Sequence, residues 1–390
     1  MKRNSLILLF SSGLFILLFY FGLLLAEHKP LWTDEINSQV SLHALSYKDI
    51  FLGRIGEGNI CPLFYAMQKA FCQFANYQTP GPWMDSEDIY AKIFLRLQPV
   101  LFMSLTMVAI FYYFARFHSW GMGFYSFFLS LSSYMVWIYW AEARHYSLWV
   151  FLTALQSLLF LRWVQEKKTR DQLWIFLAIV HLLLSVTVIF SLAQIFIVSL
   201  LMWIFREERE ARFRWIRYVF LSIIPMAISL FYYFHSPHFE FQFALTPEQL
   251  IRDSFSRDRF YILFIYTFLL SAYWLGKKWQ RPVFLKNDSL LQVLPFWLLT
   301  ILMLGAAFII LWLFHLKDHG TGFAITNRYF IFLTPIGIIA TVLFTEGIIK
   351  SLSAYRWIQF VFISGIGYLV IQRFLKMIPH VKSLCAGMFS

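Results

Sequence analysis

Charged residues are scarce in this chain. Asp, Glu, Lys and Arg make up 14% of its 390 residues, whereas 59% are hydrophobic. A soluble protein of ordinary composition is about one-quarter charged, so the shortage argues against a soluble protein. None of the four residue types falls in the middle of a long hydrophobic run, and His181 is the one titratable group well inside such a run. Ion-coupled transporters and proton pumps usually carry ionisable groups at that depth. The sequence therefore disfavours both classes, and we interpret His181 as a helix-packing residue.

Cysteine is rare as well, with three in the whole chain. Cys61 and Cys72 fall in the same predicted external loop, and on one helix their separation in sequence corresponds to about 16 Å, beyond disulfide reach. Cys385 lies in the C-terminal segment. We therefore expect no structural disulfide and no zinc site. Internal repeats, low-complexity tracts and linkers are also missing, so we treat 1–390 as a single integral membrane domain with no separate soluble domain.

Long apolar runs recur from one end of the chain to the other. One transmembrane helix needs about 20 apolar residues, and the runs predict an all-α fold, a polytopic membrane helix bundle of about eleven transmembrane helices. The predicted spans cover residues 5–26, 93–115, 120–140, 146–164, 172–187, 189–205, 216–234, 259–275, 290–315, 329–349 and 355–375. The first run, Leu6 to Ala26, is too long for the apolar part of a signal peptide, and no small-residue cleavage site follows it. We interpret it as a retained span.

Membrane topology follows from the distribution of Lys and Arg, which concentrate in cytoplasmic loops. The run 172–205 is too long for one crossing, and two crossings place the Arg-rich segment 206–217 on the same side as the N-terminus. That side then carries nearly all of the net charge of +12, which reflects topology and gives no reason to expect a nucleic-acid partner. We expect a multi-pass protein of the cell inner (plasma) membrane, with a cytoplasmic N-terminus and an active site on the external or periplasmic face.

The largest segment outside the predicted spans is the external loop 27–92. Apolar residues recur at every fourth position within 35–45, which predicts a short amphipathic helix. A second helix is predicted from Pro62, since proline suits the first helical position, to about Phe74. Neither helix is long enough to span a membrane, and we expect both to lie along its outer surface as interfacial helices.

Two adjacent carboxylates, Asp34 and Glu35, open this loop just past the first span. Adjacent helical residues point about 100° apart, so the two side chains cannot address one ligand in the same way. In a structural interpretation, Asp34 caps the following helix and Glu35 lies in its first turn, where the helix dipole favours negative charge. In a catalytic interpretation, one carboxylate is a general base and the other pairs with a cation or contacts an acceptor.

Two arginines beside tyrosines are predicted on the same external face. Arg144 lies in a short hinge with Glu142 and Tyr146, and Arg328-Tyr329 precedes a later span. Such residues often anchor helices at headgroup depth. Arginine is also the preferred bidentate partner of phosphate, so both roles stay open.

The order of these features resembles the polyprenyl-phosphate-sugar-dependent branch of the C-type glycosyltransferases (GT-C fold), which includes the protein O-mannosyltransferases and the aminoarabinose transferase that acts on lipid A. That branch has an Asp-Glu pair after its first span, a Pro-Leu-Tyr-Tyr helix in the same loop, a Glu-Ala-Arg-x-Tyr hinge after its third span, and a late Arg-Tyr before a proline-containing span. The matching residues are Asp34-Glu35, Pro62-Leu63-Phe64-Tyr65, Glu142-Ala143-Arg144-His145-Tyr146, and Arg328-Tyr329 with Pro335. Where the branch often has His-Pro ahead of Pro-Leu-Tyr-Tyr, this chain has Ile60 and Cys61.

The resemblance implies an inverting glycosyltransferase that moves a sugar from a polyprenyl-phosphate donor to a hydroxyl of a lipid, protein or polysaccharide acceptor. Asp34 would be the general base, and Glu35 would position the acceptor or pair with an arginine, for which Arg96 is the candidate. Arg144 and Arg328 would hold the donor phosphate. The residues expected to line the site are Tyr65, Tyr146, Tyr329, Asn59 and Glu142. The sequence requires no cofactor; a divalent metal beside the acidic pair is compatible with it, although no spacing here is a metal signature.

Three other functions remain open. A lipid-linked sugar flippase or transporter would predict polar residues through the spans and repeat-related halves. An oligosaccharide ligase would use a lipid pyrophosphate donor. In a scaffold without catalysis, the acidic pair would only stabilise a helix, by at most about 1 kcal/mol.

Overall fold

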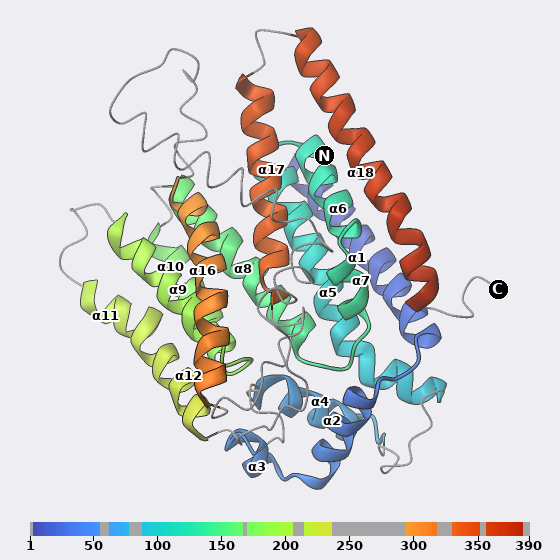
Figure 1. Ribbon diagram of the computed structural model, residues 1–390, viewed down its shortest axis with the longest axis vertical. Coiled ribbons are helices and arrows are strands. Elements are labelled where there is room, and N and C mark those ends of the chain that lie inside the picture. The colour runs from blue at the N-terminus through green and yellow to red at the C-terminus, as the bar shows by residue number, and fades with distance from the viewer. Residues whose placement is uncertain are drawn as a thin grey trace.

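The computed structural model describes residues 3–54, 62–77, 88–166, 170–205, 214–235, 294–317, 330–351 and 356–384. These residues form helices packed side by side, and no strand occurs among them (Figure 1). The predicted all-α class is therefore confirmed for this part of the chain.

Six helical stretches within the described ranges are long and apolar enough to cross a membrane. They are α1 (Arg3–His28), α5 (Ile89–Phe117), α8 (Tyr146–Gln165), the stretch Ile216–His235, α17 (Leu333–Ser351) and α18 (Arg356–Leu384). The fourth of these combines α11 (Arg214–Tyr218), the π-helix η1 (Val219–Ile223) and α12 (Ile224–His235). The total of about eleven spans stays a prediction, and the predicted span 259–275 lies outside the described residues.

The long apolar run 172–205 is divided as predicted. It forms two helices, α9 (Arg170–Ser185) and α10 (Ser191–Ile204), joined by a turn. His181 is fully buried on α9, where one ring nitrogen lies 2.6 Å from the Leu221 carbonyl and the other 2.9 Å from Gln156 Nε2. Both ring nitrogens are therefore engaged, which agrees with a helix-packing role.

One predicted span, 120–140, is wrong as a single helix. The chain forms α6 (Trp120–Leu131) and α7 (Tyr134–Trp140) instead. Ser132 ends α6, and its hydroxyl donates to the Leu129 carbonyl at 2.8 Å. The indole of Trp137 donates to the Leu131 carbonyl at 2.7 Å. Such side-chain bonds to the backbone compete with the helical ladder, so the serines allow a break that hydropathy does not reveal.

The break also receives a charged side chain from α18. This helix continues past the predicted span 355–375, so Arg373 is not at its end. Arg373 Nε donates to the Ser132 carbonyl at 3.0 Å. Arg373 therefore satisfies a carbonyl freed by the broken helix.

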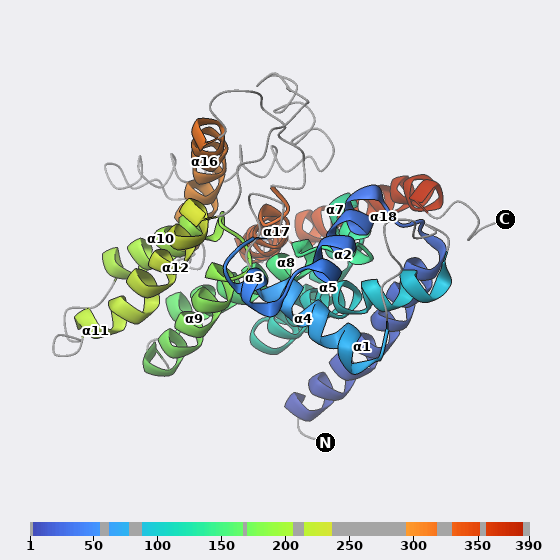
Figure 2. The same cartoon turned by 90° about the horizontal axis from the view of Figure 1, so that it is seen from below.

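Three short helices lie across one end of the bundle, at the bottom of Figure 1 and facing the viewer in Figure 2. They are α2 (Thr33–Ala44), α3 (Tyr47–Phe51) and α4 (Pro62–Phe74). The two helices predicted in the first loop are thereby confirmed as helices, while their place along a membrane surface stays a prediction. α3 was not predicted, although Ser46 and Asp49 form a capping box at its start, a pattern that can be recognised in a sequence.

The first helix approaches its neighbours closely at Gly22. A Cβ atom at this position would lie 2.5 Å from Val100 Cγ1 and 2.7 Å from Trp140 Nε1. By contrast, a Cβ atom at Gly13 on the same helix would meet no atom within 4 Å. Glycine is therefore required at Gly22 by the close approach of α5 and α7.

We expect Gly22→Ala to lower the free energy of unfolding by about 1–3 kcal/mol, because the added methyl group overpacks the interface. Gly13→Ala should not lower stability, because its methyl group meets open space and alanine favours a helix more than glycine does. The midpoint of thermal unfolding of the purified protein, followed by tryptophan fluorescence, tests this difference. Equal midpoints for the two variants would show that α1 does not pack on α5 at Gly22.

Candidate functional site

The two adjacent carboxylates at the start of α2 point to different partners. The helix begins at Thr33, so Trp32 occupies the capping position and Asp34 lies inside the first turn. Glu35 accepts the backbone N–H of Trp32 at 2.9 Å, which is one half of a capping box. The interpretation of Asp34 as the helix cap is therefore wrong, because the helix begins before Asp34, whereas Glu35 lies in the first turn as that interpretation expected.

Glu35 is fully buried and paired with Arg96 of α5. Arg96 donates from Nε to Glu35 Oε1 at 2.9 Å and from Nη2 to Oε2 at 2.6 Å. The backbone N–H of Ala143 adds a third donor at 2.5 Å. Burial by itself would raise the pKa of Glu35, but the charge and hydrogen bonds of Arg96 outweigh burial and hold this pKa below its ordinary value. Of the two roles expected for Glu35, pairing with an arginine is confirmed, with Arg96 as the partner.

The remaining donors of Arg96 hold the linker between α1 and α2. Its Nη1 donates to the carbonyls of Ala26, at 3.0 Å, and Lys29, and its Nη2 donates to Pro30 at 2.7 Å. A guanidinium has five N–H groups, and all five are engaged. Arg96 therefore fixes the path of the chain into α2, as well as the carboxylate of Glu35.

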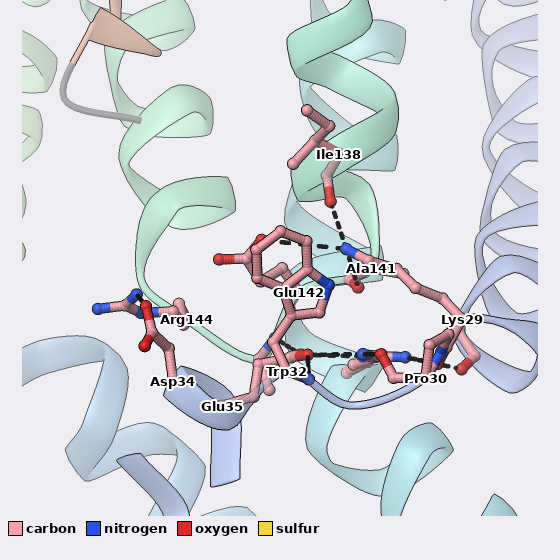
Figure 3. Close-up of polar contacts among 12 residues, drawn as sticks. Lys29, Pro30, Trp32, Asp34, Glu35, Ile138, Ala141, Glu142 and Arg144 are labelled. Carbon is pink, nitrogen blue, oxygen red and sulfur yellow. Dashed lines mark hydrogen bonds and ion pairs between the residues drawn. The ribbon is translucent and has the colours of Figure 1, made fainter. Parts of the chain in front are cut away.

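Lys29 is a functional candidate that the sequence interpretation missed. It is 1% exposed, and its Nζ donates to the carbonyls of Ile138 at 2.7 Å and Ala141 at 3.3 Å, at the end of α7. Its Nζ also lies 3.9 Å from Glu142 Oε2 (Figure 3). A cation at a helix C-terminus is favourable. Glu142, which was expected to line the site, therefore lies beside Lys29. Lys29 was missed because a lysine just past a predicted span is typical of a membrane anchor.

Asp34 forms an ion pair with Arg144. Arg144 Nη1 lies 2.7 Å from Asp34 Oδ2, and the pair is drawn at the left of Figure 3. The side chain of Asp34 is 45% exposed, whereas that of Arg144 is 4% exposed. The guanidinium of Arg144 also lies over the ring of Tyr146, 5.3 Å from its centroid. The pair therefore joins an accessible carboxylate to a buried, oriented cation.

The aromatic rings predicted to line the site come together between α4 and α8. Tyr65 and Tyr146 are both at most 1% exposed, and His145 lies between them. The ring centroids of Tyr65 and His145 are 6.5 Å apart, and those of His145 and Tyr146 are 4.4 Å apart. His145 was not predicted, although it lies inside the motif. The predicted residues Arg328, Tyr329 and Asn59 lie outside the described residues.

An apolar groove of about 690 Å³ runs between α10, α12 and α16 (Leu294–Lys317). Apart from Tyr233, the described residues that line it are apolar. One of them, Phe190, stacks on Trp149 of α8 at 6.0 Å between ring centroids. The turn before α10 also accepts a hydrogen bond from α4, because Leu63 donates its backbone N–H to the Val186 carbonyl at 2.8 Å. The turn that contributes Ile189 to the lining is therefore hydrogen-bonded to the layer of short helices.

In the described part of the chain, no three side chains of His, Cys, Asp or Glu gather where they could hold a metal ion. A divalent metal beside the acidic pair stays a prediction. No protein-family model matches the sequence, and a search of the curated proteins finds no significant match. The resemblance to the C-type glycosyltransferases therefore stays a prediction that rests on the four motifs, of which Asp34-Glu35 is the first.

Proposed function

We propose that this protein is an inverting glycosyltransferase that moves a sugar from a polyprenyl-phosphate donor to an acceptor hydroxyl at the external membrane face. The observation that supports it best is the ion pair of Asp34 with Arg144, at one end of a bundle of apolar helices. A half-exposed carboxylate can accept a proton from a hydroxyl. A buried guanidinium can hold a phosphate with two parallel hydrogen bonds.

The reaction needs few protein groups. The acceptor oxygen attacks the anomeric carbon of the donor sugar from the face opposite the phosphate, and its proton passes to Asp34. The bond between that carbon and the phosphate oxygen breaks, and polyprenyl phosphate leaves with the electron pair. Arg144, with Arg328 as its proposed partner, takes up the negative charge of the leaving group. A phosphate leaves without a general acid, so one carboxylate suffices where a glycoside hydrolase needs two.

The ion pair also suggests how donor binding prepares the base. A donor phosphate would compete with Asp34 for the guanidinium of Arg144, and the carboxylate would then be available to the acceptor hydroxyl. The Glu35–Arg96 pair and Lys29 hold the start of α2 and the end of α7 in place. In this proposal Glu35, Arg96 and Lys29 are positioning residues, and Asp34 and Arg144 are catalytic residues.

We propose the apolar groove as the binding site of the donor's polyprenyl tail. A side chain at Gly305 would enter open space, because a Cβ atom there meets nothing within 4 Å. We expect Gly305→Phe to raise the KM for a long-chain donor about tenfold, the equivalent of about 1.4 kcal/mol. A short-chain, water-soluble donor should be unaffected, as should Gly13→Phe on α1 with either donor. Equal effects on both donors would contradict this placement of the tail.

The proposed reaction is tested by reconstituting the purified protein in vesicles with a polyprenyl-phosphate hexose and a membrane extract of the host as acceptor. Mass spectrometry of the lipids should show time-dependent release of free polyprenyl monophosphate. Release of polyprenyl pyrophosphate from a pyrophosphate donor would favour the oligosaccharide ligase. Movement of an intact donor between leaflets, without cleavage, would favour the flippase and contradict the transferase.

A further inference from the structure

A second cavity, of about 300 Å³, lies between α2 and α4. We call it the α2–α4 pocket. Its floor is formed by Gln39, Leu42 and Cys72, which are buried, and its rim by His43, Gln73 and Asn76, which are exposed. The volume is at the lower end of the range for small-molecule sites, so the pocket can hold one ring-sized group.

The lining contains polar groups that the protein leaves unsatisfied. Gln39 is 1% exposed, and its buried Nε2 makes no hydrogen bond within the described structure. The hydroxyl of Tyr77, which also lines the pocket, is buried and unbonded in the same way. Buried polar groups nearly always have partners. Both residues line the same cavity, so a polar molecule bound there could supply the missing partners after a small rotation of each side chain.

The walls of the pocket are preformed. Lys69 of α4 donates to the carbonyls of Leu42 at 2.8 Å and Leu45 at 2.5 Å, and so ties α4 to the end of α2. The chain then reverses after α4 at Asn76, whose φ is 53°. Tyr77 donates its N–H back to the Cys72 carbonyl at 2.9 Å. This is a Schellman turn, and it directs Tyr77 back toward the pocket.

The chemistry of the lining selects the class of ligand. Three amides, an imidazole and a phenol can both donate and accept hydrogen bonds, and no carboxylate is found among the described residues that line the pocket. Within that described lining Lys69 carries the one ammonium group, which already donates to two backbone carbonyls. A dedicated anion site would present a cation that is free to bind. The lining instead suits a neutral ring with several hydroxyl groups above an apolar floor, which describes a sugar.

The pocket shares α2 with the proposed general base. Gln39 comes five positions after Asp34, a rise of about 7.5 Å and a rotation of about 140°. A ring in the pocket is therefore not the ring that reacts at Asp34. We infer that the α2–α4 pocket binds a neighbouring sugar ring of the acceptor, so that the acceptor is a glycan or glycolipid. The assignment of this sugar to the acceptor rests on the proposed function, whereas sugar binding by the pocket does not.

Cys72 on the floor supplies a direct probe of the pocket. In full-length protein carrying Cys61→Ser and Cys385→Ser, Cys72 is the one remaining thiol, and methyl methanethiosulfonate can report its accessibility. Burial raises the pKa of Cys72, so labelling is run at alkaline pH, where more thiolate forms. The probes are methyl α-glucopyranoside, methyl α-mannopyranoside and methyl α-galactopyranoside, with sorbitol as the open-chain control.

A bound pyranoside should slow the modification of Cys72 about threefold when it is present at twice its Kd, by simple mass action. Gln39→Leu should abolish this protection. Gln98→Leu should retain it, because Gln98 is also a buried glutamine with an unbonded amide oxygen but does not line the pocket. Asn76→Gly, which keeps the left-handed turn and removes a rim amide, should weaken protection without unfolding the protein.

The outcomes separate the pocket from the proposed reaction. If no pyranoside protects a reactive Cys72, or if inorganic phosphate protects it instead, the sugar pocket is overturned. Loss of protection in Gln98→Leu equal to that in Gln39→Leu would overturn it as well. Release of polyprenyl monophosphate in the vesicle assay with no protection would refute only the pocket. Protection with no lipid release would refute only the transferase, and the pocket would stand as a sugar site of another function.

Discussion

Arg96→Met should leave little folded protein in the membrane fraction. The substitution leaves Glu35 buried without its cation and frees three backbone carbonyls between Ala26 and Pro30. Removing one partner of a buried ion pair costs about 3–5 kcal/mol, a large share of the total stability of a typical domain. The measurement is the yield of monodisperse protein after mild solubilisation, together with its thermal unfolding midpoint.

A double variant separates the effect of an unpaired buried charge on stability from the effect of lost hydrogen bonds to the backbone. Glu35→Met with Arg96→Met removes both charges, and replacing a whole buried pair by apolar side chains is often neutral. Recovery should nevertheless be partial here, because the N–H groups of Trp32 and Ala143 lose their acceptor as well. Asp34→Asn is the control and should keep normal yield, since that side chain is 45% exposed. Normal yield of Arg96→Met would contradict the positioning role of the buried pair.

Arg144→Gln should abolish most transfer while leaving the fold intact. The carboxylate of Asp34, which loses its partner, is half exposed, so water can replace the lost contact and no buried charge is left unpaired. The loss of the cation at the leaving phosphate should lower kcat by about 10²–10³, as for other groups that stabilise developing negative charge. Arg144→Lys keeps the charge but not the bidentate geometry and should retain an intermediate rate.

The same substitution discriminates catalysis from anchoring. Asp34 and Arg144 act on one transition state in the proposed mechanism, so combining Arg144→Gln with Asp34→Asn should reduce activity much less than the product of the two single losses. Rates are compared per amount of folded protein. If Arg144→Gln loses activity only in proportion to folded protein, Arg144 is a membrane anchor and the proposed phosphate role is wrong.

The elements that the sequence predicts well are those set by local patterns. Continuous apolar runs give the long helices, and Pro62 marks the start of α4. Arg96 could be proposed as the partner of Glu35 because both fall at the external end of the predicted topology, and a buried ion pair joins them. The sequence could not predict which of the two carboxylates pairs with Arg96 and which with Arg144. The choice depends on which of the two adjacent side chains points toward α5.

Features that depend on tertiary packing gave no sequence signal. In the sequence Lys29 resembles a surface anchor, and only the folded chain brings it to the carbonyls at the end of α7. The helix break at Ser132 falls within a run that is hydrophobic enough to form one continuous span. The apolar groove and the α2–α4 pocket arise where helices distant in sequence leave space between them. Gln39 illustrates the difficulty, since only its burial without a hydrogen-bond partner distinguishes it from an ordinary polar residue of a short helix.

The most direct test of the catalytic role of Asp34 is lipid mass spectrometry on the native host. Three strains are compared, with the gene intact, deleted, or carrying Asp34→Asn, and the amount of protein is checked in each. The proposed mechanism predicts that the same polyprenyl-phosphate sugar accumulates in the deletion strain and in Asp34→Asn at normal protein level. A lipid change in the deletion strain that is missing from Asp34→Asn would contradict it, because Asp34 would then be dispensable.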